Sequence, residues 1–337
     1  MKHVLIIGGG PAGMEASAKL TQLGFSVTLV EQTEKLGGKL NQWDRLFPNG
    51  RLANDLLHDI YKNLNTDVQP VLNTTLSEIK REDNRFVATL SNGYIVVADA
   101  ILVTTGFELF DAHRKEEYGY GIYDNVITSA DLERLFHDNQ EIRTSSGKIP
   151  KRIGIIHCVG SRDEKAGNTY CSQVCCITAV KQAIELTEAL PGLEVFSFYM
   201  DLRMFGRHFE EIYKKAQIDH NVQFIRGRLS EAFENSDGSI MLKVEDTLLN
   251  KPLKLNVDMV VLMVGMEPSK TSMFLQEKLQ ISHNGDGFLT PYDPHYASAK
   301  TDVPGIFIAG ACSGPKTMDA TLNDARSAAL QVADYLR

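Results

Sequence analysis

The chain has 337 residues, 43% of them hydrophobic, and a formal net charge of -8. This length and composition are sufficient for two packed domains. The acidic balance, without a run of basic residues, argues against binding to nucleic acid or to an anionic membrane surface. The chain starts directly with an apolar strand, without a charged leader or a bilayer-spanning stretch, so we expect a cytoplasmic protein with no membrane span.

The first thirty residues predict a βαβ unit. An apolar strand at residues 2–7 and a glycine turn precede an amphipathic helix from Ala12 to Leu23, and a second strand runs from Ser26 to Glu31. β-branched and aromatic residues predict later strands at Arg85–Leu90, Tyr94–Val97, Ala100–Thr104, Arg152–His157, Glu194–Tyr199, Val222–Arg226, Ser239–Glu245, Met259–Val264 and Gly305–Ile308. Helical periodicity predicts further helices at Cys176–Leu190, Gly206–Gln217 and Asp319–Leu336.

This order of elements predicts two Rossmann-like α/β domains. A polar, glycine-containing stretch interrupts the pattern between Gly106 and Lys151, and a second strand-led unit begins after it. The last fifty residues again carry a strand and a glycine-rich turn, so the first domain is expected to be discontinuous. We therefore expect a first domain of residues 1–110 and 285–337, a connecting segment of residues 111–150 and a second domain of residues 151–284.

The turn from Gly8 to Gly13 fits G-x-G-x-x-G between a strand and a helix. Gly8 permits the tight turn, Gly10 lets the backbone approach a pyrophosphate, and Gly13 lets helix and strand pack closely. Glu31, at the end of the second strand, is placed to accept the hydroxyls of an adenosine ribose. A glycine turn that packs without a ligand is the alternative, and between ligands the pattern alone leaves FAD and NAD open.

Three later segments resemble the flavoproteins with two dinucleotide-binding domains, such as thioredoxin reductase. They are Leu36–Lys39, Ala100–Gly106 and Thr301–Ala311. The resemblance implies a thioredoxin reductase-like architecture and FAD as cofactor, although Cys312 stands where that superfamily usually has an aspartate. The expected cofactor-binding residues are Gly8, Gly10, Pro11, Ala12, Gly13, Glu31, Gly38, Lys39, Leu76, Thr104, Thr105, Gly106, Gly310, Ala311, Cys312, Lys316 and Thr317.

No catalytic residue is expected beyond the cofactors. Lys316 is a candidate for tuning the flavin, because a cation near the isoalloxazine ring would favour its reduced anion. A solvated lysine in a turn is the equal alternative.

Four of the five cysteines, Cys158, Cys171, Cys175 and Cys176, lie within nineteen residues. The second domain lacks both G-x-G-x-x-G and Cys-x-x-Cys, and a disulfide between two adjacent cysteines would be strained. The spacing suits a [4Fe-4S] cluster, a structural zinc site or unligated core cysteines. Cys312 lies apart from this block and is not expected to be a ligand.

The cysteine block and its surroundings resemble the A subunit of heterodisulfide reductase, a family of methanogens with relatives in sulfur-metabolising bacteria. The resemblance covers nearly the whole chain, and its stretches are Gly119–Gly121, Asn125–Thr128, His157–Arg162, Tyr170–Ser172 with Cys175 and Cys176, Tyr199–Arg203 with Gly206 and Glu210, and Ala309–Lys316. It implies one [4Fe-4S] cluster on Cys158, Cys171, Cys175 and Cys176, close to the flavin. The chain lacks the ferredoxin segments of the methanogen proteins, which makes it similar to the short form in heterodisulfide reductase-like complexes of bacterial sulfur oxidisers.

The resemblance implies an electron-transfer subunit of a heterodisulfide reductase-like complex that acts in cytoplasmic sulfur oxidation. Its partners would be the cysteine-rich subunits B and C, and flavoproteins of this shape commonly form homodimers. One alternative is an NAD(P)H-dependent flavin or disulfide reductase, and another is a scaffold that holds flavin and zinc. The residues Tyr199, Met200, Asp201 and Arg203 are expected either to border the cluster or only to end a strand and pair ionically.

Overall fold

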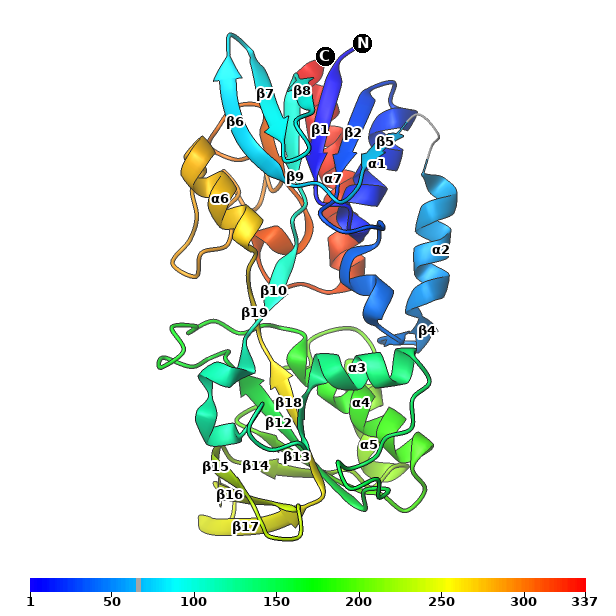
Figure 1. Ribbon diagram of the computed structural model, residues 1–337, viewed down its shortest axis with the longest axis vertical. Helices are drawn as coiled ribbons and strands as arrows, with labels where there is room; N and C mark the ends of the chain where they lie inside the picture. Colours follow the sequence, from blue (N-terminus) through cyan, green and yellow to red (C-terminus); the bar gives the residue numbers. More distant parts are fainter. Residues whose placement is uncertain (65–67) are drawn as a thin grey trace. The chain divides into compact units, whose positions relative to one another are not determined.

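The computed structural model describes residues 1–64 and 68–337, which form two compact units (Figure 1). The first unit consists of Met1–Asn41, Ala53–Glu108 and Glu267–Arg337, and the second of Gln42–Leu52 and Leu109–Met266. The short strands β10 (Phe107–Leu109) and β19 (Met266–Pro268) pair where the chain passes from one unit to the other.

A five-stranded parallel sheet with the order β20-β9-β1-β2-β5 forms the centre of the first unit. An antiparallel sheet, β6-β7-β8, packs into the same hydrophobic core. The strands of the unit are β1 His3–Ile7, β2 Ser26–Val30, β5 Val68–Val71, β6 Leu76–Glu82, β7 Arg85–Leu90, β8 Ile95–Ala98, β9 Ala100–Val103 and β20 Ile306–Ile308. Its helices are α1 Pro11–Gln22, α2 Ala53–Asn63, α6 Lys270–Leu279 and α7 Met318–Leu336, with 3-10 turns at Gly38–Gln42 and Gly310–Ser313.

The second unit repeats this plan with a parallel sheet of order β11-β18-β12-β13-β14 and an antiparallel sheet, β15-β16-β17. Its strands are β3 Arg45–Leu46, β4 Arg51–Leu52, β11 Val126–Thr128, β12 Arg152–Val159, β13 Glu194–Tyr199, β14 Gln223–Arg226, β15 Leu229–Glu234, β16 Ile240–Asp246, β17 Lys251–Val257 and β18 Met259–Val264. Its helices are α3 Ser129–His137, α4 Cys175–Ala189 and α5 Phe209–Ile218, with 3-10 turns at Ala112–Arg114 and Glu116–Tyr118.

Both parallel sheets reverse their strand order at an inner strand, β1 in the first unit and β12 in the second. In the first unit β2 and β5 follow β1 on one side, while β9 lies on the other. In the second unit β13 and β14 follow β12 on one side, while β18 lies on the other. Ligands of open α/β sheets bind at the carboxyl ends of the strands at such a reversal. The predicted α/β fold of two Rossmann-like units is therefore confirmed, and each unit has one place of this kind.

The predicted strands and helices are present, and β7, β13 and β18 have the predicted bounds. The expected connecting segment, residues 111–150, differs from the structure because it joins the second unit. Its strand β11 pairs with β18, and Val126 lies opposite Val260. The helix α3 then starts with a capping box in which Thr128 and Asp131 bond reciprocally.

Two further stretches differ from the expected boundaries. Residues 42–52 belong to the second unit, although the sequence on both sides of them belongs to the first. Residues 267–284, expected in the second domain, belong to the first because Leu275 of α6 and Ile281 are buried in the core of the first unit. Neither stretch carries a periodic pattern that would reveal its partner from the sequence.

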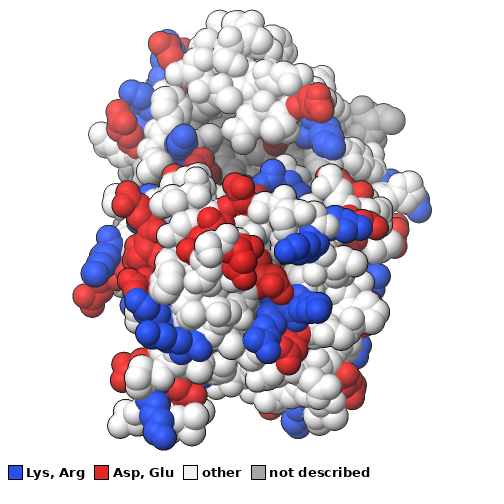
Figure 2. Space-filling model, turned by 60° about the horizontal axis from the view of Figure 1, so that its bottom comes forward, with Lys and Arg blue, Asp and Glu red and all other residues white. Residues whose placement is uncertain are grey.

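No helix in the described part of the chain is long and apolar enough to cross a membrane. On the face in Figure 2, Lys and Arg side chains alternate with Asp and Glu side chains over short distances. That face presents no broad basic area of the kind that binds nucleic acid.

Candidate functional site

The glycine turn of the first unit lies at the carboxyl end of β1, where the strand order reverses. Gly8 has a φ of +113°, and a Cβ added to Gly13 would lie 1.9 Å from the Gly8 carbonyl oxygen. Gly10 is the N-cap of α1, no side chain caps the helix there, and a Cβ on Gly10 would meet nothing within 4 Å. Pro11 and Ala12 form the first turn of α1. The structure thus leaves no room for a side chain at Gly13, whereas the space beside Gly10 is open.

The Glu31 carboxylate holds the glycine turn from the next strand. It is buried, and its Oε2 accepts the Gly9 N–H at 2.7 Å. Its Oε1 accepts the Thr33 N–H at 2.9 Å and the Thr33 hydroxyl at 2.8 Å. The carboxylate therefore lies beside the turn and fixes the backbone next to the open space at Gly10.

Two of the expected flavin segments reach the same turn. A Cβ on Gly38 would lie 3.2 Å from the Gly10 Cα. The Thr104 hydroxyl donates to the carbonyl oxygens of Ile7 at 3.1 Å and Gly8 at 2.8 Å. Lys39 lies with its Nζ 5.1 Å from the centre of the Phe107 ring.

Lys39, Thr105 and Gly106 belong to the same two segments. Burial lowers the pKa of Lys39, and the nearby Glu108 partly opposes that shift. The Thr105 hydroxyl is 2.6 Å from the Ser272 hydroxyl, and Gly106 has a φ of +65°.

The C-terminal segment meets the start of α1 at Gly310, where an added Cβ would lie 3.0 Å from the Ala12 Cβ. The neighbouring Ala311 lies in the same 3-10 turn and is buried. The Thr317 hydroxyl caps α7 by accepting the Ala320 N–H at 3.4 Å.

Cys312, Leu76 and Lys316 contact other residues of the first unit. Cys312 and Leu76 lie in the hydrophobic core of the first unit, and burial raises the pKa of the Cys312 thiol to about 11. Its Sγ is 3.3 Å from the Val103 carbonyl oxygen. Lys316 forms an ion pair with Asp324. A role of Lys316 toward a flavin stays a prediction.

The cysteines of the second unit lie at the carboxyl end of β12 and at the start of α4. Cys158 sits at an irregularity between β12 and β18, with a left-handed φ of +59°. Cys175 and Cys176 are the first two residues of α4, and no side chain caps this helix at Val174. All three cysteines are buried. Their place in the second unit is the strand-order reversal at which a nucleotide would otherwise bind.

The Cys175 thiol is hydrogen-bonded to the thiols of both Cys158 and Cys176. Hydrogen bonds with the Cys175 thiol lower the pKa of Cys158 and the pKa of Cys176. The pKa of Cys175 rises because of its hydrogen bonds with the same two thiols. Among the described residues, no three His, Cys, Asp or Glu side chains surround a single point as ligands of one metal ion.

Cys171 lies on the loop of residues 160–174 and is half-buried. Its Sγ accepts the Gln173 N–H at 3.3 Å. Hydrogen bonds on both sides fix this loop: the Tyr170 hydroxyl donates to the Met266 carbonyl oxygen at 2.7 Å, and the Ser172 N–H donates to the Ser161 hydroxyl at 3.0 Å. The structure thus brings three of the four predicted ligands together and holds the fourth on a fixed loop.

Sequence reasoning did not assign roles to His157 and Arg162. The His157 Nε2 is 2.8 Å from the Ser197 hydroxyl, and the imidazole also interacts with the Cys176 thiol and lowers its pKa. Arg162 forms an ion pair with Asp201, and the Arg203 Nε lies 3.8 Å from the same carboxylate. Asp201 and Arg203 thus lie at ionic distance, in line with one of the two alternatives considered for them. The signal for Arg162 was its place in the stretch His157–Arg162.

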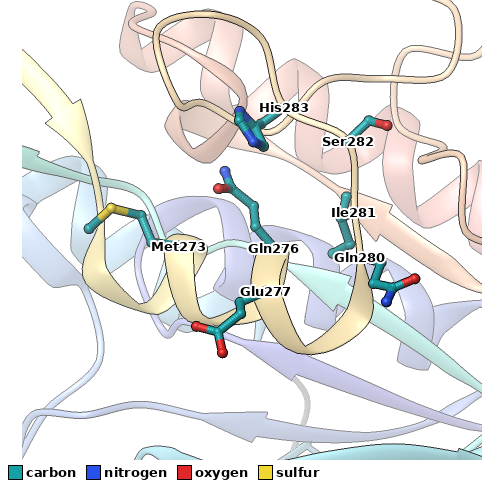
Figure 3. Close-up of a pocket in the computed structure, with 7 residues that line it drawn as sticks. All are labelled: Met273, Gln276, Glu277, Gln280, Ile281, Ser282 and His283. Atoms are coloured by element: carbon teal, nitrogen blue, oxygen red, sulfur yellow. The ribbon is translucent and has the colours of Figure 1, made fainter.

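A surface depression of the first unit lies away from these residues. It is lined by α6 and the chain after it, and Figure 3 shows the side chains of Gln276 and His283 pointing toward one another. The Gln276 amide donates to the Gly287 carbonyl oxygen at 2.6 Å, and the Ser282 hydroxyl donates to Asp302 at 2.6 Å. None of the predicted cofactor residues lines this depression.

Comparison with known proteins gives a family and a fold. A profile of the family described as pyridine nucleotide-disulphide oxidoreductase matches residues 2–329. Among solved structures, thioredoxin reductase from Lactococcus lactis has a TM-score of 0.71 at 19% identity, with 100% of this chain and 99% of that chain covered. At this identity the likeness shows the fold alone, and it confirms the predicted thioredoxin reductase-like architecture.

Two curated relatives come from methanogens. The chain is 46% identical over 239 residues to the A subunit of the H(2)/formate:CoB-CoM heterodisulfide,ferredoxin reductase of Methanococcus maripaludis. This alignment covers 69% of this chain and 36% of that protein. It is 33% identical over 421 residues to an iron-sulfur A subunit, numbered 2, of the CoB-CoM heterodisulfide reductase of Methanopyrus kandleri, covering 99% of this chain and 64% of that protein. The chain thus spans between about a third and two thirds of these relatives' length.

Proposed function

Because the chain belongs to the pyridine nucleotide-disulphide oxidoreductase family, whose members are flavin-dependent oxidoreductases, we propose that it is an FAD- and [4Fe-4S]-containing electron-transfer subunit of a heterodisulfide reductase-like complex. The observation that carries this proposal is the group of three thiols at the strand-order reversal of the second sheet. The names of the relatives support it, since both are A subunits of heterodisulfide reductases and one is called an iron-sulfur protein.

The complex would act in cytoplasmic sulfur oxidation, with cysteine-rich subunits B and C as partners and a homodimer of this chain. These statements rest on the resemblance of the cysteine block and on the relatives, which are subunits of larger enzymes by name. The alignment with the Methanopyrus kandleri protein has 421 positions, more than the 337 residues of this chain, so that relative carries segments that this chain lacks. The expectation of one cluster rests on the single block of four cysteines in this chain.

The first unit would hold FAD at the glycine turn. The uncapped N-terminal N–H groups of α1 would bind the pyrophosphate, and Gly10 leaves room for it. Glu31 already orients the turn through the Gly9 N–H, and its carboxylate would accept hydroxyl groups of the adenosine ribose. Lys39 would add a positive charge at this site, and burial lowers the pKa of its side chain.

The second unit would hold the cluster on Cys158, Cys171, Cys175 and Cys176, one thiolate per iron. The residues fit such a group because the donors are all thiols and because two of them, Cys175 and Cys176, stand in the first turn of the uncapped helix α4. The His157 imidazole is hydrogen-bonded to the Cys176 thiol and so lies beside one of the proposed ligands. Bound FAD would supply two-electron chemistry with single-electron release, and the bound cluster would carry one electron at a time.

The test is a metal, sulfide and flavin analysis of the chain purified without oxygen. We expect FAD with about four iron and four sulfide per chain. Cys175→Ser should lose most of the iron and keep the flavin, because Cys175 lies in the other unit from the glycine turn. Cys312→Ser is the matched control: Cys312 is buried in the core of the first unit, so this variant should keep its iron.

Other results would replace the proposal. A protein with flavin but no iron, whose spectrum is unchanged in Cys175→Ser, contradicts the cluster. Zinc in place of iron would indicate a scaffold. Rapid bleaching of the flavin by NADH in the iron-free chain would indicate an NAD(P)H-dependent flavin or disulfide reductase.

A further inference from the structure

The backbone of Arg162 lies beside the loop that carries Cys171. Arg162 is the fourth residue after Cys158, and its φ of +54° is left-handed. Its N–H donates to the Tyr170 carbonyl oxygen at 2.9 Å, so it is bonded to the residue directly before Cys171. A non-glycine residue in this conformation costs free energy and persists where the surrounding structure requires it.

The side chain of Arg162 is held at the same place by Asp201. The guanidinium forms an ion pair with the Asp201 carboxylate, and its Nη2 is 3.4 Å from Oδ2. The backbone carbonyl oxygen of Asp201 is 3.9 Å from the Cys176 Sγ. Arg162 is therefore connected to Cys171 through its backbone and to the surroundings of Cys176 through its side chain.

The charge of Arg162 acts on the thiols. Burial opposes the charged form, but Asp201, and then Cys158 and Cys171, raise the pKa of Arg162. Its side chain is 22% exposed, compared with 46% for that of Arg203, which lies by the same carboxylate. Since solvent screens an exposed charge more strongly, the charge of Arg162 is screened less than that of Arg203.

We propose that Arg162, oriented by Asp201, raises the reduction potential of the cluster held by Cys158, Cys171, Cys175 and Cys176. This inference rests on the proposed function. Each electron that enters the cluster makes it more negative by one charge, and a fixed positive charge beside it stabilises that reduced form. Arg162 touches no reacting atom and is a positioning residue whose contribution is its charge and its fixed location.

The experiment is an anaerobic redox titration of the cluster, followed by electron paramagnetic resonance, in the full chain with dithionite as reductant. Arg162→Gln should shift the midpoint potential to a more negative value at unchanged iron content. Arg162→Lys keeps the charge without the paired geometry, so its potential should lie between those of wild type and Arg162→Gln. The control is Arg152→Gln: Arg152 pairs with Glu194 at 2.6 Å at the opposite end of β12 from Cys158.

The outcomes separate this inference from the function on which it rests. A wild-type chain without iron removes the proposed function itself. Iron-loaded Arg162→Gln with the wild-type potential overturns only the role of Arg162. If Arg162→Gln and Arg162→Met both lose iron while Arg162→Lys retains it, Arg162 serves cluster assembly, and its assignment to the potential is overturned as well.

Discussion

The two units have similar parallel sheets, but the connection from the strand at the reversal, β1 or β12, to the following helix differs between them. In the first unit three residues, Gly8 to Gly10, connect β1 to α1. In the second unit fifteen residues, 160–174, connect β12 to α4. A short turn brings the helix N-terminus directly to the sheet edge and leaves room for a phosphate. A long loop can instead carry a further thiol, as residues 160–174 carry Cys171, so the two connections present different chemical groups.

The backbone at the strand end is left-handed in both units. Gly8 has a φ of +113° and Cys158 a φ of +59°. Glycine adopts such angles at little cost, whereas an L-residue costs roughly 1 kcal/mol. The second unit therefore places a thiol where the first has no side chain at all.

The largest effect is expected from a substitution that forces α1 away from the short turn. In Gly13→Ala the new methyl group would lie 1.9 Å from the Gly8 carbonyl oxygen, so α1 and the turn must separate. We expect a loss of about 4 to 5 kcal/mol in the free energy of unfolding and loss of bound FAD. Urea unfolding and the flavin-to-protein absorbance ratio measure the two quantities.

The control for this variant is Gly285→Ala, where an added methyl group meets nothing within 4 Å. It should unfold like wild type and bind FAD normally. If Gly13→Ala also behaves like wild type, α1 does not pack on the turn as described.

A smaller effect is expected from buried ionisable side chains of α1 and α4, the helices that follow the two connections. In α1, Glu15 pairs with Arg326 of α7 at 2.6 Å. In α4, Lys181 contacts two carboxylates, those of Glu133 and Glu185, and its Nζ is 3.2 Å from the Glu185 Oε2. Burial raises the pKa of Glu185 from 4.5 to about 7, although Lys181 opposes the shift.

The sign of the resulting pH dependence follows from these values. Between pH 4.5 and about 7 the folded chain retains a proton on Glu185 that the unfolded chain releases. The free energy of unfolding should therefore fall as the pH rises through this window, by at most about 3 kcal/mol. Glu185→Gln should remove this slope in urea unfolding. Glu188→Gln on the same helix, with a half-exposed side chain, should keep it, and equal slopes in all three proteins would contradict the assignment.

The sequence predicted those parts of the fold and site that depend on local pattern. The βαβ unit, the glycine turn and the cysteine spacing are each contained in a short stretch, and the predicted β7, β13 and β18 have the observed bounds. The pairing of β11 with β18 joins residues more than 130 positions apart, so residues 111–150 read as a connection. The ion pair of Arg162 with Asp201 depends on the order of strands β12 and β13 in the same way.

The smallest effect is expected from a substitution at Gly10, on the open side of the turn. Gly10 has an extended backbone, with a φ of -72°, and its added Cβ would meet nothing within 4 Å. Gly10→Ala should therefore leave the unfolding of the flavin-free chain unchanged within about 0.5 kcal/mol. The methyl group would fill the space proposed for the FAD pyrophosphate, so the affinity for FAD should fall by roughly tenfold or more, which is about 1.4 kcal/mol.

Flavin fluorescence titration of the flavin-free protein measures this affinity, and Gly285→Ala is again the matched control because its methyl group also enters open space. A weakened affinity in Gly10→Ala alone would locate the ligand at the open side of the turn. Equal affinities in both variants would mean that the pyrophosphate does not pass Gly10. In that case the short connection would not act as a phosphate site, and the difference between the two units would have to be sought in the thiols alone.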